Sequence, residues 1–78
     1  MPTVRYFAAA REAAGVADEE VAAGSTVELG AILADRHGPR MAQVLAISSL
    51  VCDGVRLGPD DAVPADACVD VLPPFAGG

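Results

Sequence analysis

The sequence predicts a two-layer α+β domain in which helix covers one face of a small sheet. Residues 3–8 alternate apolar and other side chains, as a strand with one buried face does. Residues 25–37 carry apolar side chains at helical spacing, and short strand-like segments return after them. Strands, a covering helix and returning strands make a two-layer fold, and 78 residues allow one domain.

The first predicted strand, residues 3–8, sets the two faces of the sheet. Its alternation places one set of side chains inward, namely Val4, Tyr6 and Ala8. Arg5 and Phe7 share the opposite face, which we expect to meet solvent because it carries the arginine.

A short helix and a second strand are predicted next. Residues 9–14 (AAREAA) have high helix propensity, and Gly15 ends the helix. Residues 19–22 favour a strand that pairs with the first as a hairpin.

The main helix begins at a capping box, Ser25 with Glu28 three residues later. Leu29, Ile32 and Leu33 then form its apolar face, and residues 37–39 (His-Gly-Pro) end it. We expect His37 to cap the negative end of this helix. We expect Gly30 to allow close packing on the sheet.

The second half of the chain consists of short predicted elements. Residues 40–46 favour a second short helix. Residues 49–52 and 55–57 favour two strands joined by a tight turn at Asp53-Gly54. The last strand, 68–72, is expected beside the first as a central parallel pair, with Cys68, Asp70 and Leu72 outward and Val69 and Val71 inward.

Composition narrows the possible partners. The net charge is −6, with five arginines and no lysine, which argues against nucleic acid and anionic membranes as ligands. No signal peptide or long apolar stretch is visible, so we expect a cytoplasmic protein with Cys52 and Cys68 as reduced thiols. We expect no bound metal or cofactor, because the candidate ligands are too few to form a site: two cysteines, one histidine and the pair Asp60-Asp61.

The C-terminal residues have a composition of their own. We expect residues 1–72 to form the domain and 73–78 an extended flexible tail. Pro73-Pro74 would hold the chain extended, Phe75-Ala76 would anchor it in a partner, and Gly77-Gly78 would enter a narrow cleft because glycine has no Cβ. The predicted reactive group is the carboxylate of Gly78, not a side chain.

Phe7 and Leu72 are predicted to share the outer sheet face beside this tail. An exposed apolar patch there suggests a docking surface for a partner. The alternative is that Phe7 closes one end of the core.

Three segments together carry a family resemblance. They are V-R-Y-F-A-x-x-R-E-x-x-G (Val4 to Gly15), Ser25-Thr26-Val27-Glu28, and L-P-P-F-A-G-G (Leu72 to Gly78). The chain resembles the small subunits of molybdopterin synthase, which are ubiquitin-like sulfur carriers. The resemblance implies a β-grasp fold, with a mixed sheet of four to five strands covered by one main helix.

It also implies a function without catalytic side chains. An ATP-dependent, ubiquitin-activating-like adenylyltransferase would adenylate Gly78, and a sulfur donor protein would convert it to a thiocarboxylate. The synthase large subunit would then pass the sulfur to a pterin precursor, in a complex of two small and two large subunits. The chain itself would be no enzyme and would bind no cofactor, because ATP is used by the activating enzyme.

Other functions stay open at this point. The chain could carry sulfur for thiamine or cysteine synthesis, because the tail chemistry is shared. It could be a protein modifier joined through Gly78 to lysines of targets, or an interaction module with an inert tail.

Overall fold

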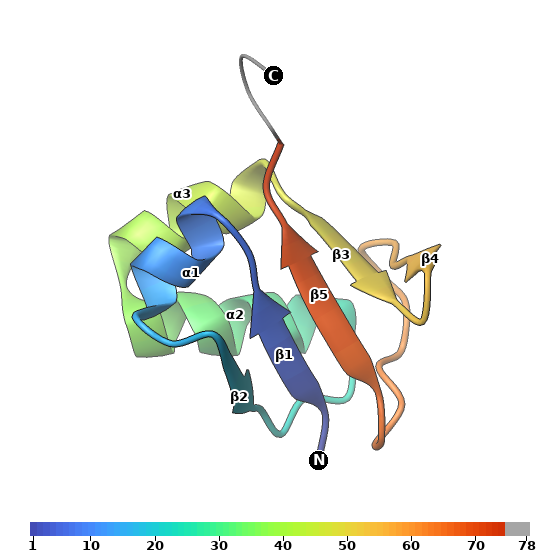
Figure 1. Cartoon of the computed structure of the whole chain (residues 1–78). Helices are drawn as coiled ribbons and strands as arrows, with labels where there is room; N and C mark the ends of the chain where they lie inside the picture. The colour runs from blue at the N-terminus through green and yellow to red at the C-terminus, as the bar shows by residue number, and fades with distance from the viewer. Residues whose placement is uncertain (75–78) are drawn as a thin grey trace.

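A computed structural model describes residues 1–74 of the chain. Five strands form one mixed sheet in the order β2-β1-β5-β3-β4. Their bounds are β1 Thr3–Tyr6, β2 Asp18–Glu20, β3 Ser49–Cys52, β4 Val55–Arg56 and β5 Cys68–Leu72. Three helices, α1 Ala9–Ala14, α2 Thr26–His37 and α3 Pro39–Ala46, lie on one side of the sheet, and α2 is the longest (Figure 1).

The centre of the sheet is the parallel pair of β1 and β5, as predicted. Val4 lies opposite Val69 and Tyr6 opposite Val71. β3 pairs antiparallel with the other side of β5 and places Cys52 opposite Val69. The final strand of the chain therefore has a neighbour on each side.

The core lies between this sheet and the helices. Val69 and Val71 are fully buried, while Cys68, Asp70 and Leu72 between them are partly exposed, which confirms the two predicted faces of β5. Most of the largest fully buried side chains of the core come from the sheet and from the helices α2 and α3. They are Leu29, Leu33, Met41, Val4, Val21, Val69 and Val71.

The capping box at the start of α2 is confirmed, with one change. The Ser25 hydroxyl accepts the Glu28 N–H at 3.1 Å. The Glu28 carboxylate accepts the N–H of Gly24 at 2.7 Å, so this second bond falls one residue before the N-cap. The first bond satisfies a backbone donor that the helix itself leaves free, and the second fixes the chain that enters it.

The first strand is shorter than predicted. It ends at Tyr6, and Ala8 is exposed where alternation placed it inward. Ala8 has a positive φ of 51° and forms the N-cap of α1, where its carbonyl oxygen accepts the N–H groups of Arg11 and Glu12. The start of this helix therefore takes Ala8 out of the strand.

The second strand lies earlier in the chain than predicted. Tyr6 N–H donates to the Ala17 carbonyl, and Val21 N–H donates to the Pro2 carbonyl, both at 2.9 Å. These two hydrogen bonds lie at either end of the pairing between β1 and β2. Ala22, which was predicted to end the second strand, lies outside this pairing. Strand pairing thus set the bounds of β2.

Two glycine predictions had opposite outcomes. Asp53-Gly54 forms the predicted tight turn, with φ values of 51° and 80°, which suit a hairpin of right-handed twist. The close packing expected at Gly30 is wrong, because an added Cβ would meet no atom within 4 Å. Nothing in the structure explains a glycine at this position.

Candidate functional site: the tail root and the outer sheet face

The chain leaves the sheet at the C-terminal end of β5, which is the central strand. Leu72 is the last residue of β5 and lies opposite Ser49 of β3. Pro73 is buried against the domain and Pro74 is exposed. We call residues 72–74 the tail root. The predicted site residues Phe75, Ala76, Gly77 and Gly78 lie outside the described residues.

An ion pair crosses the two central strands on the outer face. Arg5 of β1 donates from Nε and Nη2 to the two carboxylate oxygens of Asp70 of β5, at 2.7 and 3.0 Å. These two parallel bonds lock the guanidinium in one plane. The hydrogen bond that Arg5 donates to Asp70, followed by the negative charge of Asp70, raises the pKa of Arg5 above its ordinary value.

The two predicted docking residues lie beside this ion pair. Phe7 is 36% exposed and does not belong to the buried core, and its ring centroid is 5.5 Å from the Arg5 guanidinium carbon. Leu72 is partly exposed on the face that Asp70 shares. The structure therefore places Phe7 and Leu72 at the surface, and their binding role stays a prediction.

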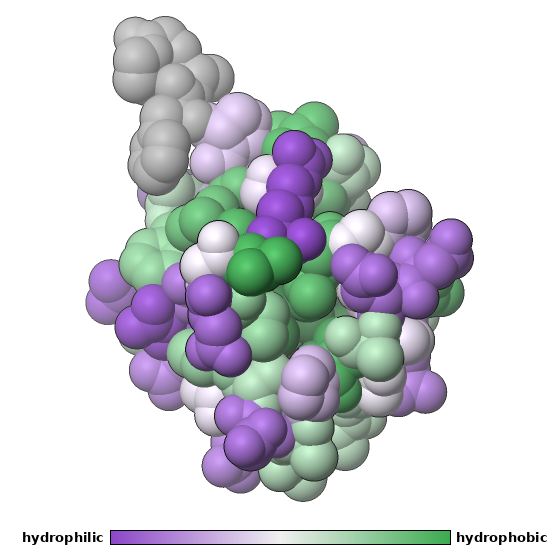
Figure 2. All heavy atoms as spheres, turned by 90° about the vertical axis from the view of Figure 1, so that its right-hand side faces the viewer, coloured by the Kyte–Doolittle hydropathy of each residue, from purple (hydrophilic) through white to green (hydrophobic). Residues whose placement is uncertain are grey.

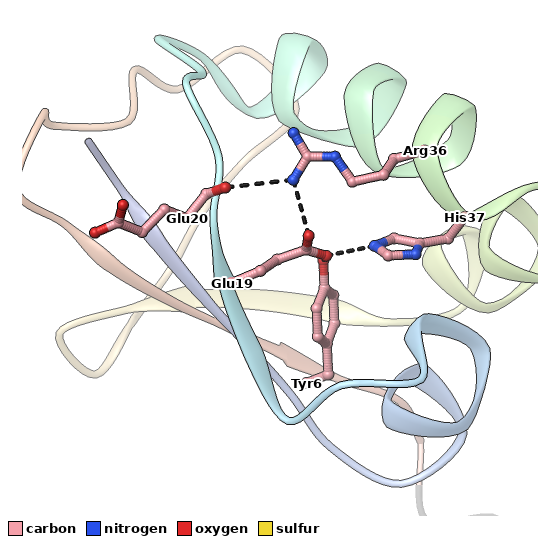
Figure 3. A network of polar contacts seen from close by, with 5 residues as sticks. All are labelled: Tyr6, Glu19, Glu20, Arg36 and His37. Carbon is pink, nitrogen blue, oxygen red and sulfur yellow. Dashed lines mark hydrogen bonds and ion pairs between the residues drawn. The ribbon is translucent and has the colours of Figure 1, made fainter.

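A polar network that sequence reasoning missed ties β1 and β2 to the last turn of α2 (Figure 3). The carboxylate of Glu19 accepts hydrogen bonds from the Tyr6 hydroxyl at 2.5 Å and from Nη1 of Arg36 at 2.8 Å. The same carboxylate contacts Nε2 of His37. Arg36 also donates to the main-chain carbonyl of Glu20 at 3.3 Å.

The network shifts two pKa values in opposite directions. Burial, followed by the hydrogen bond to Glu19, raises the pKa of Tyr6 far above its ordinary value. Burial also acts to raise the pKa of Glu19, but the hydrogen bonds from Tyr6, Arg36 and His37 outweigh it and leave that pKa below its ordinary value. Glu19 is therefore a carboxylate at neutral pH.

His37 does not have the role predicted for it. Its ring packs edge-on against Tyr6, with centroids 5.8 Å apart, and its Nε2 faces Glu19 instead of the helix carbonyls. Gly38 ends the helix instead, with its N–H donating to the Ala34 carbonyl at 2.8 Å. The signal that could have found this network was the inward-facing tyrosine, because a buried hydroxyl requires a partner.

The two cysteines are free thiols on opposite faces of the sheet. Cys52 lies on the inner face, where burial and then Asp53 raise the pKa of its thiol. Cys68 lies on the outer face of β5. Within residues 1–74 no group of side chains could hold a metal ion, and no helix is long and apolar enough to cross a membrane.

The sheet order, the central parallel pair and the helices on one face define the ubiquitin-like β-grasp fold. Solved structures of other proteins share it, at sequence identities that establish likeness of fold alone. A putative molybdopterin converting factor subunit 1 from Pyrococcus furiosus has a TM-score of 0.82 at 24% identity, over 95% of this chain and 97% of that one.

Two further structures are modifiers by name. The solution structure of small archaeal modifier protein 1 from Methanosarcina acetivorans has a TM-score of 0.85 at 20% identity, over 99% of this chain and 95% of that one. SAMP1 from Haloferax volcanii has a TM-score of 0.78 at 18% identity, over 99% of this chain and 98% of that one. No protein-family model and no curated protein sequence matches the chain.

Proposed function

We propose that the chain is a cytoplasmic sulfur carrier whose reactive group is the Gly78 carboxylate, acting as the small subunit of molybdopterin synthase. The observation that carries this proposal is the place of the tail root in a ubiquitin-like fold. The last strand is central, and the residues Pro-Pro-Phe-Ala-Gly-Gly follow it without any charged side chain. Such an end can reach a partner's active site without bringing a side-chain charge with it.

The proposed chemistry proceeds in two steps on this end. An oxygen of the Gly78 carboxylate attacks the α-phosphorus of ATP, which forms an acyl–adenylate bond and releases pyrophosphate. A sulfur nucleophile at the sulfide oxidation level then attacks the acyl carbon, so that a C–S bond forms and AMP leaves. The product is a thiocarboxylate, a soft nucleophile that the tail delivers to a second active site.

Partner proteins supply the catalysis in this proposal. An adenylyltransferase of the ubiquitin-activating type performs the first step, a sulfur donor protein the second, and the synthase large subunit consumes the thiocarboxylate. The chain contributes orientation and delivery, because a tethered reactant reaches a high effective concentration at its target. Phe7 and Leu72, with Pro73 and Pro74, would form the contact surface.

Mass spectrometry of the protein isolated from its own host tests the proposal. The expected result is a fraction of molecules heavier by the difference between one sulfur and one oxygen atom, with the change confined to the C-terminal peptide. Deletion of Gly78 should abolish this species and leave the unfolding temperature unchanged. Absence of the heavier species in a host that makes molybdopterin would refute the carrier function.

Protein modification is the second candidate, and a specific observation favours it. Two of the similar structures described above are named small archaeal modifier protein 1 or SAMP1. A modifier would be joined through the same activated Gly78 to lysine side chains of other proteins. Adducts that carry the C-terminal peptide of this chain on target lysines would support it, and co-purification with a molybdopterin synthase large subunit would support the carrier. Sulfur carriage for thiamine or cysteine synthesis predicts neither result.

A further inference from the structure

We propose that the end of α3, centred on Ile47, is a second docking wall for the ATP-dependent enzyme that adenylates Gly78. This inference rests on the proposed function and adds a contact surface on the side of the tail root opposite to Phe7. It follows from the strand register, the short reach of the tail, and the charge and exposure of the residues involved.

The strand register places two segments on either side of the tail root. β1 pairs with one side of β5 through Tyr6 and Val71, so Phe7 follows directly beside the end of β5. β3 pairs with the other side through Ser49 and Leu72, so Ile47 and Ser48 precede that pair. Figure 1 shows the C-terminal end of α3 beside the point where the chain leaves β5.

The length of the tail brings the enzyme onto these two segments. Four residues follow Pro74, and a fully extended chain advances about 3.5 Å per residue, so Gly78 ends within about 14 Å of Pro74. Sites that bind small molecules such as ATP are concave, so their walls extend beyond the reacting atoms. A wall that surrounds Gly78 within this distance comes close to the residues that flank the tail root, and these residues are therefore placed to contact it.

Ile47 is an exposed apolar side chain at one of these flanks. It is 65% exposed, against 36% for Phe7 on the other flank. Burial of such a side chain at the centre of an interface contributes to affinity, as hot-spot residues do. Figure 2 shows apolar side chains in the upper part of the β3–β4 side, near the end from which the chain leaves β5.

The charge distribution fits a nucleotide-binding partner. The chain has a net charge of −6, but residues 41–52 and 71–78 contain no charged side chain. In Figure 2, strongly hydrophilic side chains lie at the left and right edges, in the lower part and in one column through the upper centre of the face, with apolar side chains on either side of that column. A basic cleft that holds ATP phosphates would attract this acidic domain, and it could cover the flanks without burying an unpaired carboxylate.

The substitution Ile47→Asp tests the inference, with Val55→Asp as a matched control. Val55 is 66% exposed and follows the Asp53-Gly54 turn, toward the end of β5 away from the tail root. The assay is ATP–pyrophosphate exchange by the activating-type adenylyltransferase of the same organism, with each full-length variant as the carboxylate substrate. Thermal unfolding of each variant verifies that the fold is retained, and Ile47→Ser serves if Ile47→Asp does not fold.

The expected result is a loss of about tenfold or more in kcat/KM for Ile47→Asp, through KM and with kcat retained. Val55→Asp should stay within about twofold of the wild type. Equal effects of the two substitutions, or no effect of Ile47→Asp, would overturn the docking wall while leaving the proposed function intact. No exchange with the wild-type chain would instead refute the proposed function, and the inference with it.

Discussion

Replacing the Glu19 carboxylate by an amide should destabilise the fold by about 2–3 kcal/mol at pH 7. A hydrogen bond to a charged group contributes about 1.5–3 kcal/mol, and Tyr6 donates one such bond to Glu19 at 2.5 Å. The partly exposed ion pair with Arg36 adds about 0.5 kcal/mol. The amide nitrogen that Glu19→Gln introduces cannot accept a hydrogen bond, so the substitution leaves at least one of the three donors unpaired.

Thermal unfolding followed by circular dichroism measures this loss. One kcal/mol shifts the midpoint of a domain this size by about 4–8 °C, so Glu19→Gln should lower it by roughly 10–20 °C. Glu20→Gln is the control, because Glu20 is the next residue of β2, is exposed, and contributes only its main-chain carbonyl to the network. The control should change stability by less than about 0.5 kcal/mol.

The pH dependence identifies the mechanism. The pKa of Glu19 is lower in the folded chain than in the unfolded one, so its contribution is complete above the ordinary carboxyl pKa and is lost as pH falls through the folded value. The stability difference between wild type and Glu19→Gln should therefore shrink below about pH 4. Equal midpoints for Glu19→Gln and Glu20→Gln at pH 7, or a difference that persists unchanged in acid, would refute the role given to this carboxylate.

Three further perturbations test other parts of the structure. The wild type should lose stability above about pH 10, because the pKa of Tyr6 is raised in the folded state and the unfolded tyrosine ionises first. Denaturant titrations at several pH values compare the free energies of unfolding of the wild type and Tyr6→Phe. An equal alkaline loss in both proteins would contradict this reasoning. Ser25→Ala should cost about 1 kcal/mol by urea unfolding through the lost cap of α2, whereas a change at Ser25 no larger than at exposed Ala31 (Ala31→Ser) would contradict the cap. Leu33→Ala should cost about 2–5 kcal/mol, because Leu33 is fully buried; a loss below about 1 kcal/mol would show that the core does not depend on it.

Local sequence patterns were sufficient for most elements of the fold and for the two faces of its last strand. The capping box located α2, and Asp53-Gly54 located the tight turn, because each depends on residues within a few positions of one another. Alternation along β5 correctly separated its buried valines from Asp70. The predicted parallel pairing of the first and last strands is also correct, since a central pair is the compact solution for this order of elements.

Local sequence patterns failed where residues distant in the chain determine the bounds of an element or the contacts of a side chain. The bounds of β2 follow from its ladder with β1, and Ala8 leaves its strand to begin a helix. The partner of Tyr6 lies 13 residues away on β2, and that of His37 lies 18 residues away, so no local pattern could assign them to one network. A side chain that contacts a remote residue takes its role from tertiary packing.

For the candidate site too, one part could be predicted from the sequence and another part required the folded structure. Its proposed chemistry can be inferred from the covalent chain, because the residues Pro-Pro-Phe-Ala-Gly-Gly and their lack of charge are independent of folding. The surroundings of the tail root required the folded structure, since the register of β5 with both neighbours brings Phe7 to one side and Ile47 to the other. These two residues are 40 positions apart in the chain, and they flank the same exit because β5 is inserted between β1 and β3.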